Sequence, residues 1–175
     1  MIGTSYGAIS VVNAIPCGIG ATMGVALQTR AQFTKWDTTE IRIINGRDID
    51  DRLVRLCVKR TLDAIGVSTG TPYRLTIKSQ IPPSRGLKSS SSVCNAVIRS
   101  VLNSYNEHME DIDILRLGVE CAKEAGVTIT GAFDDACGCY FGGLVFTDNS
   151  RNVILERQDI PDYDVVLWIP ESTIP

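Results

Sequence analysis

The sequence has a single histidine, no long run of apolar residues and no clustered basic segment. Its longest apolar runs, residues 142–146 and 165–169, are far shorter than the ~20 residues that span a bilayer, so we expect no membrane segment. A Ser-His-Asp or Cys-His mechanism would have to use His108, which is part of a polar connection. We therefore expect an exposed histidine and set histidine chemistry aside.

The charge balance excludes a general nucleic-acid binder. The chain of 175 residues has 17 basic and 20 acidic side chains and a formal net charge of -3, whereas neutralising phosphates needs a clustered basic face. The N-terminus has neither a basic leader nor a long apolar region, so we expect no secretory signal and a cytoplasmic location. The length is typical of one domain, or of one domain and a fragment.

The cysteines do not form a metal-binding pattern. None belongs to a Cys-x-x-Cys pair, and Cys137 and Cys139, with one histidine in the chain, do not complete a zinc set. Their positions in apolar segments are typical of small buried residues in a reducing compartment. The six are Cys17, Cys57, Cys94, Cys121, Cys137 and Cys139.

Hydrophobic periodicity predicts both strands and helices. Apolar residues alternate along residues 20–33, which indicates a strand covered on one face. Recurrence at three to four residues predicts a helix from Asp50 to Ile65 that Gly66 stops. Other predicted strands are 41–44, ended by an Asn45-Gly46 turn, and 73–82, 143–147, 153–156 and 164–169. Other predicted helices follow residue 88 and span 111–125 and 134–140. This order is typical of an α+β fold.

The segment 82–92, PPSRGLKSSSS, joins a proline pair and a glycine to four serines at the start of a predicted helix. A helix N-terminus offers unpaired N–H groups and partial positive charge, which stabilise an anion. Gly86 lets the backbone approach a ligand, and the serine hydroxyls add donors or a ligand for Mg²⁺. The alternative is that one serine caps the helix and the others are exposed. The spacing fits neither a Walker loop nor a dinucleotide fingerprint.

A second segment, residues 128–143, places Asp134 and Asp135 at the start of a short helix among small and apolar residues. One carboxylate is a candidate general base or metal partner while the other caps the helix. Alternatively, both are acids of the first turn that the helix dipole favours.

On the preceding helix, Glu120 and Glu124 are four residues apart and share one face. Either is a candidate ligand for a divalent metal. The alternative is that both are solvated and paired with Lys123 or Arg116.

These motifs resemble one family. PPSRGLKSSSS is similar to the Pro-x-x-x-Gly-Leu-x-Ser-Ser-Ser/Ala phosphate-binding motif of the GHMP small-molecule kinases. Together with this motif, residues 126–149, GVTITGAFDDACGCYFGGLVFTDN, look like the archaeal-type shikimate kinase branch. Residues 10–27, SVVNAIPCGIGATMGVAL, resemble the N-terminal segment of that branch. The resemblance covers nearly the whole chain, with two separated motifs in the right order.

The resemblance implies phosphoryl transfer from ATP, with Mg²⁺, to the 3-hydroxyl of shikimate in aromatic amino-acid biosynthesis. It implies a GHMP N-terminal domain of mixed sheet and helices at residues 1–162. Residues 163–175 would then be the first strand of a ferredoxin-like C-terminal domain that is missing or only begun. The alternatives are a non-catalytic nucleotide- or metabolite-binding module and a kinase for another small alcohol, such as homoserine.

Site roles also come from the resemblance. Asp134 matches the catalytic base, and Asp134 and Asp135 would face the substrate. Such chemistry needs positioning and charge neutralisation more than covalent catalysis. The implied nucleotide-binding residues are Pro82, Pro83, Ser84, Arg85, Gly86, Leu87, Lys88, Ser89, Ser90, Ser91 and Ser92. The implied metal ligands are Ser89 or Ser90 with Glu120 or Glu124.

Lys88 departs from the wider family, because most GHMP kinases have glycine there, although lysine fits the shikimate branch. Two roles remain open for it, a phosphate contact and an exposed side chain. Arg85 and Arg30 are available cations for the carboxylate of shikimate. The sequence predicts no oligomeric state.

Overall fold

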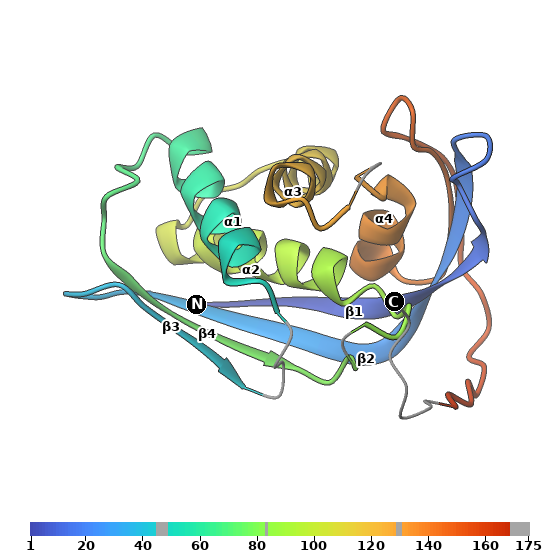
Figure 1. Ribbon diagram of the computed structural model, residues 1–175, viewed down its shortest axis with the longest axis horizontal. Coiled ribbons are helices and arrows are strands. Elements are labelled where there is room, and N and C mark those ends of the chain that lie inside the picture. Colours follow the sequence, from blue (N-terminus) through green and yellow to red (C-terminus); the bar gives the residue numbers. More distant parts are fainter. Residues whose placement is uncertain (45–48, 83, 129–130, 169–175) are drawn as a thin grey trace.

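The computed structural model describes residues 1–44, 49–82, 84–128 and 131–168. In this part of the chain, a curved six-stranded sheet carries four helices on one side (Figure 1). The strands are β1 (Ile2–Val12), β2 (Ile19–Lys35), β3 (Glu40–Ile44), β4 (Tyr73–Ser79), β5 (Leu144–Asp148) and β6 (Val153–Gln158). The helices are α1 (Asp51–Ala64), α2 (Ser89–Tyr105), α3 (Asp111–Ala125) and α4 (Phe133–Phe141). The α+β class predicted from the sequence is confirmed.

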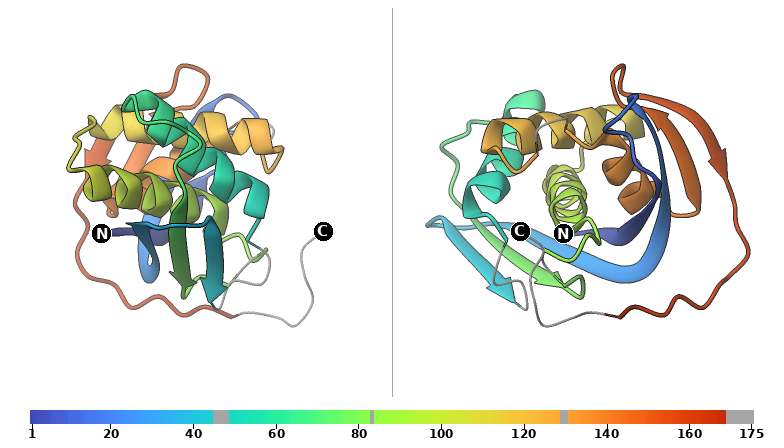
Figure 2. Two further views of the ribbon diagram at one scale, coloured as in Figure 1. Left: turned by 90° about the vertical axis from the view of Figure 1, so that its left-hand side faces the viewer. Right: turned by 45° about the vertical axis from the view of Figure 1, so that its right-hand side comes forward.

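Strand β2 is the longest strand and connects the two ends of the sheet. Strand β1 runs antiparallel along one edge of β2. On the other edge, residues 19–23 pair with β5 and residues 29–35 pair with β4. Strand β3 is parallel to β4 and β6 is antiparallel to β5, so the sheet is mixed. Figure 2 shows that β2 bends and carries β5 and β6 around toward the helices.

The alternation predicted for β2 is confirmed in its second half. Thr29, Ala31 and Phe33 are buried, whereas Arg30 and Gln32 between them are exposed. The buried side chains join a core that α1, α2 and α3 cover. Helix α2 packs on both β1 and β2, so the sheet holds this helix in position.

Local signals explain the ends of the helices. The carboxylate of Asp50 accepts hydrogen bonds from the backbone N–H groups of Arg52 (2.7 Å) and Leu53 (3.3 Å) at the start of α1. Helix α3 spans the predicted residues and ends at Gly126, whose φ of +77° suits glycine. Within the described ranges, none of the helices has the length and apolar character that crossing a bilayer requires.

Periodicity alone does not predict β1, because glycines interrupt its pattern. A Cβ atom at Gly3 would overlap the Ala96 carbonyl oxygen of α2 and lie 2.5 Å from Ser100 N. Gly7 similarly has Val25 of β2 within 3.1 Å of an added Cβ. Gly3, which lets β1 approach α2, and Gly7, which lies against β2, thus leave two positions of the strand without an apolar side chain.

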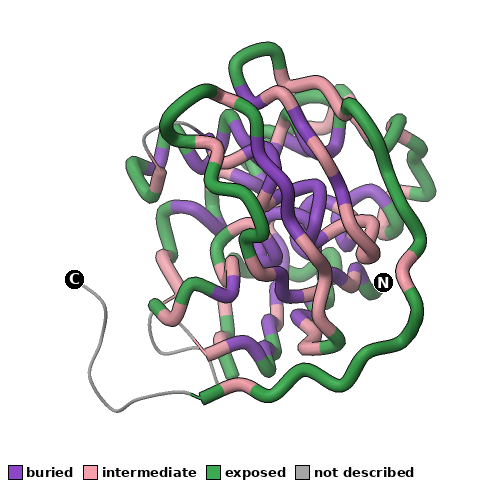
Figure 3. The backbone as a smooth tube through the Cα atoms, turned by 90° about the vertical axis from the view of Figure 1, so that its right-hand side faces the viewer, coloured by how far each residue is buried: buried purple, intermediate pink, exposed green. Residues whose placement is uncertain are grey.

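The strand predicted at 164–169 is wrong over 164–168, which is extended but has no assigned strand pairing. Its apolar side chains Val166 and Trp168 are 92% and 87% exposed, and Figure 3 shows this stretch running along the outside. Residue 169 lies outside the described residues, as does the turn predicted at 45–46. The domain boundary at 162/163 stays a prediction.

The prediction that all six cysteines are buried is wrong for Cys17, which is exposed. Cys17 is part of the β1–β2 connection, which includes Gly18 with a φ of +79°. The other five are buried free thiols, as predicted.

Candidate functional site

The loop from β4 to α2 has an unusual backbone. Ser84, Gly86 and Lys88 all have positive φ angles, of 54°, 72° and 64°. Lys88 is the N-cap of α2, and among the described residues no side chain caps the start of this helix. The alternative that a serine caps the helix is therefore wrong. The first backbone N–H groups of α2, beginning at Ser89, have no partner within the helix and can receive an anion.

A cavity of about 260 Å³, here called the loop cavity, lies at the start of α2. Of the four serines, Ser89, Ser90 and Ser91 line it, whereas Ser92 is fully buried behind them. In the described part of the chain, the Ser92 hydroxyl has no hydrogen-bond partner. Pro83 lies outside the described residues. The other predicted nucleotide-binding residues that line the loop cavity are Pro82, Ser84, Arg85, Gly86, Leu87 and Lys88.

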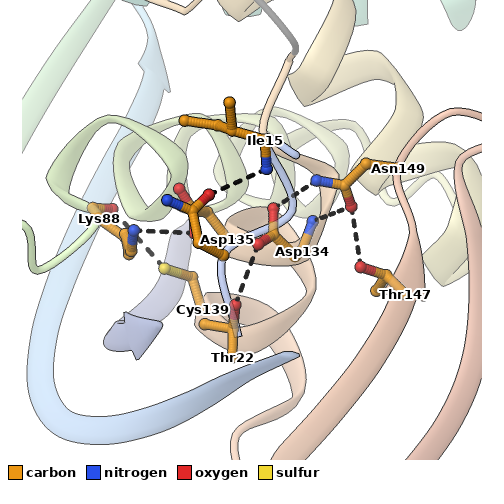
Figure 4. A network of polar contacts seen from close by, with 9 residues as sticks. Ile15, Thr22, Lys88, Asp134, Asp135, Cys139, Thr147 and Asn149 are labelled. Atoms are coloured by element: carbon orange, nitrogen blue, oxygen red, sulfur yellow. Dashed lines mark hydrogen bonds and ion pairs between the residues drawn. The ribbon is translucent and has the colours of Figure 1, made fainter. Parts of the chain in front are cut away.

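Asp134, in the first turn of α4, is held by polar side chains (Figure 4). Its Oδ1 accepts a 2.6 Å hydrogen bond from Asn149 Nδ2, and its Oδ2 accepts a 3.5 Å bond from Thr22 Oγ1. Asn149 Oδ1 accepts from the Asp134 backbone N–H (2.9 Å) and from Thr147 Oγ1 (2.8 Å). Only 5% of Asp134 is exposed, so these contacts fix the carboxylate.

Gly20 of β2 makes room for this carboxylate, since a Cβ atom there would lie 2.6 Å from Asp134 Oδ2. The two glycines of the segment Gly18-Ile19-Gly20 thus have different roles. Gly18 belongs to the turn, and Gly20 allows close approach of α4 to the strand.

Asp135 faces the loop cavity and pairs with Lys88. The distance from Lys88 Nζ to Asp135 Oδ1 is 3.0 Å, and both side chains are more than four-fifths buried. The pKa of Asp135 is raised to about 6, chiefly by burial; Lys88 opposes this rise and the Asp134 charge contributes to it. Of the two roles left open for Lys88, the exposed one is excluded, because an ion pair holds this side chain.

A second cavity, of about 530 Å³, is here called the aspartate cavity because Asp134 and Asp135 line it. Asn149, Ser150 and Lys123 also line it. Residues that line both cavities are here called the seam: Lys88, Thr128, Ala132 and Asp135. A third cavity, of about 560 Å³, lies between β2 and residues 159–167 and contains none of the predicted site residues.

The predicted acidic metal ligands do not reach these cavities. Glu124 Oε2 accepts a 2.6 Å ion-pair contact from Arg60 Nη2 of α1, which lowers the pKa of Glu124. Glu120 is exposed and lines neither cavity. No cluster of three or more His, Cys, Asp or Glu side chains suited to a metal occurs among the described residues.

The two arginines proposed for a substrate carboxylate differ in position. Arg85 lines the loop cavity, whereas Arg30 lines neither cavity and donates to Gln28 Oε1 at 3.2 Å. Sequence reasoning missed Asn149 and Thr147. Their signal in the sequence is position alone: Thr147 ends the predicted strand at 143–147, and Asn149 lies two residues beyond it.

The arrangement suits the transfer of an anionic group. An uncapped helix start receives an anion in one cavity, and a fixed carboxylate lies in the next. A lysine and a second carboxylate stand on the wall that the cavities share. A group leaving a ligand in the loop cavity therefore has a short path to an acceptor beside Asp134.

Sequence comparisons relate the chain to one family of proteins. The family model of the GHMP kinases N-terminal domain matches residues 52–143. A shikimate kinase of Pyrococcus abyssi is 41% identical over 177 residues, covering 98% of this chain and 64% of that protein. A shikimate kinase of Methanothrix thermoacetophila is 41% identical over 170 residues, covering 97% of this chain and 57% of that protein. The chain thus spans about three-fifths of the length of these relatives.

Solved structures share the fold at low sequence identity. Mevalonate kinase of Methanococcus jannaschii superposes with a TM-score of 0.73 and 22% identity, covering 93% of this chain and 56% of that one. Homoserine kinase of Cytophaga hutchinsonii superposes with a TM-score of 0.66 and 16% identity, covering 91% of this chain and 52% of that one. These likenesses establish the fold.

Proposed function

The chain belongs to the GHMP kinase family, and we propose that it acts in transfer of the γ-phosphoryl group of ATP to the 3-hydroxyl of shikimate. The observation that carries this proposal is the seam, where Lys88 and Asp135 face both the loop cavity and the aspartate cavity. Relatives that are about 40% identical over nearly the whole chain are named shikimate kinases, which favours shikimate among small alcohols.

In this proposal the loop cavity holds the phosphates of ATP. Backbone N–H groups at the start of α2 and the hydroxyls of Ser89, Ser90 and Ser91 donate to the phosphate oxygens. Gly86 leaves space for the nucleotide, because nothing lies within 4 Å of an added Cβ atom. Ser92 stands behind this wall and contributes to packing rather than direct contact.

Asp134 is the proposed general base. It accepts the proton of the shikimate 3-hydroxyl as that oxygen attacks the γ-phosphorus and the bond from phosphorus to the ADP oxygen breaks. Asn149 and Thr22 hold this carboxylate toward the aspartate cavity. Asp135, at the seam, also faces the substrate and keeps Lys88 in place.

The serine hydroxyls at the loop cavity fit a Mg²⁺ ion carried by the nucleotide, since Mg²⁺ needs few protein ligands when phosphates and water supply the others. Ser89 or Ser90 would hold it, because both hydroxyls line the loop cavity. When bound, the ion neutralises phosphate charge. Glu120 and Glu124 do not fit, since neither lines a cavity.

A coupled ADP-release assay on the full-length protein tests the proposal, with shikimate, homoserine, mevalonate and galactose as acceptors. We expect turnover with shikimate alone. Turnover of another acceptor but not shikimate would refute the substrate assignment. Tight ATP binding with no turnover of any acceptor would identify a non-catalytic nucleotide-binding module instead.

Asp134→Asn tests the proposed base. We expect turnover to fall by ~1,000-fold while ATP affinity, measured by calorimetry, changes little, because the loop cavity does not include Asp134. Asp63→Asn, at an exposed position of α1, controls for the loss of one negative charge. Near-normal turnover by Asp134→Asn would remove this residue from the mechanism.

A further inference from the structure

Lys123, near the end of α3, folds over the loop that leads to α4. A Cβ atom built on Gly131 would lie 2.5 Å from Lys123 Cε, 3.3 Å from Lys123 Nζ and 2.5 Å from Val119 Cγ1. Gly131, with a φ of +91°, therefore leaves the space that the end of this lysine occupies. Lys123 and Val119 are one helical turn apart, so this face of α3 is turned toward the cavities.

The position of Lys123 is next to the seam. Lys123 itself lines the aspartate cavity, while Ala122, Val127 and Gly131 beside it line the loop cavity. The other lysine at this wall, Lys88, already pairs with Asp135. Within the described ranges, no ion pair of Lys123 with an acid is found, so its charge is available to a ligand.

The glutamates of α3 are turned elsewhere. Glu120 and Glu124 are each one residue beyond Val119 and Lys123, which rotates them by about 100° around the helix axis. Glu124 is accordingly held by Arg60 of α1. The charged side chain that α3 places at the cavities is thus a cation, where the family resemblance implied an acidic metal ligand.

We propose that Lys123 binds the γ-phosphoryl group of the nucleotide, opposite Lys88. Its positive charge would then neutralise phosphate charge, in place of a metal ion held by a carboxylate of α3. The inference rests on the proposed function, since it takes the loop cavity as the nucleotide site. A group passing from the loop cavity to the aspartate cavity crosses the seam, and the Lys123 ammonium beside the seam meets its oxygens. A lysine suits this role because its compact charge interacts with phosphate without a fixed orientation.

Binding measurements with the full-length protein test this inference without requiring turnover. Lys123→Met keeps most of the apolar stem and removes the charge. We expect its affinity for a non-hydrolysable ATP analogue to fall about tenfold, while its affinity for ADP, which lacks the γ-phosphoryl group, is unchanged. Lys78→Met, at an exposed position of β4, is the matched control and should change neither affinity.

Two results would overturn the inference. Equal losses for the ATP analogue and ADP would place Lys123 away from the γ-phosphoryl group. A loss confined to shikimate affinity would make Lys123 a carboxylate ligand of the acceptor. In Mg²⁺, the variant carrying Glu120→Gln and Glu124→Gln should keep the wild-type ratio of the affinities for the ATP analogue and ADP. A changed ratio would indicate that the glutamates bind the metal after all. If only the acceptor assay failed, the proposed function would be refuted. The ratio of the affinities for the ATP analogue and ADP would still test the role of Lys123.

Discussion

Asn149 fixes the direction of the Asp134 carboxylate, because one side-chain amide contacts both the carboxylate and the backbone N–H of the same residue. We predict that Asn149→Ala lowers kcat by ~10- to 100-fold with a smaller change in KM, since the base is still present but misplaced. Losing the acceptor of a buried N–H should also lower the free energy of unfolding by about 1–3 kcal/mol. Steady-state kinetics and urea unfolding measure the two effects.

A pH profile separates positioning from simple destabilisation. Asn149→Asp keeps an acceptor for the backbone N–H but adds a negative charge beside Asp134, so the acid limb of the kcat profile should move to higher pH. Asn103→Ala, at an exposed amide that contacts the Ile2 carbonyl, controls for the loss of one amide hydrogen bond. An unmoved acid limb in Asn149→Asp would argue against a positioning role.

Asp135 makes the free energy of unfolding depend on pH, and the direction of this dependence follows from its raised pKa. Its pKa is raised from 3.8 to about 6, so between these values the folded protein holds a proton that the unfolded chain has lost. Its contribution to the free energy of unfolding is therefore greatest at low pH and falls as pH rises toward 6. We predict that the wild type loses at most about 3 kcal/mol relative to Asp135→Asn across this window.

Denaturant unfolding of both proteins at several pH values gives this difference directly. About one pH unit above this pKa and beyond, the difference should be flat, because Asp135 is then largely ionised in both states. Asp63→Asn provides the reference for removing a charge from an exposed site. A wild-type stability that rises relative to Asp135→Asn between pH 4 and 6 would contradict the raised pKa.

Strand β1 and helix α2 meet without a side chain between them at Gly3. An added Cβ atom would overlap the backbone of α2, so β1 and α2 would have to move apart to accommodate it. We predict that Gly3→Ala lowers the free energy of unfolding by about 3 kcal/mol. Thermal and urea unfolding measure the loss. Gly70→Ala is the matched control, since an added Cβ there meets only Ser68 Oγ, at 3.7 Å, and the substitution should be tolerated.

Sequence periodicity predicts elements well where one face is covered and the other is solvated. Helix α3 and the second half of β2 have that pattern; the predicted bounds of α3 and the predicted alternation in this half of β2 are confirmed. Strand β1 escapes prediction because its contact with α2 selects glycine instead of apolar side chains. The strand predicted at 164–169 failed over 164–168 for the opposite reason, since an apolar run does not tell whether a strand has a partner.

The site is predictable only where its contacts are local. The sequence shows four serines after a glycine, and the start of α2 follows from neighbours in the chain. The pairing of Lys88 with Asp135 joins residues from different elements, and periodicity carries no signal for it. The same holds for Asn149, which reaches Asp134 from the end of β5. Composition and spacing thus identify candidate side chains, and tertiary packing decides which of them meet.

The curved sheet brings the two halves of the site together. Strand β4 leads to the loop cavity and β5 leads to Asn149, while both strands pair with opposite ends of β2. Helices α2 and α4 start beside each other at the seam, so Lys88 of one N-terminus meets Asp135 of the other. A charged ligand in one cavity therefore changes the electrostatic potential in the other cavity.

This coupling predicts that nucleotide binding is linked to protonation. Phosphates in the loop cavity add negative charge near Asp135 and compete for Lys88, and both effects raise the pKa of Asp135 above about 6. Near neutral pH the complex should then take up a fraction of a proton that the free protein lacks. Calorimetry in two buffers of different ionisation enthalpy measures this uptake. Asp135→Asn should bind the nucleotide with less uptake than the wild type. Equal uptake in the two proteins would place the phosphates away from the seam.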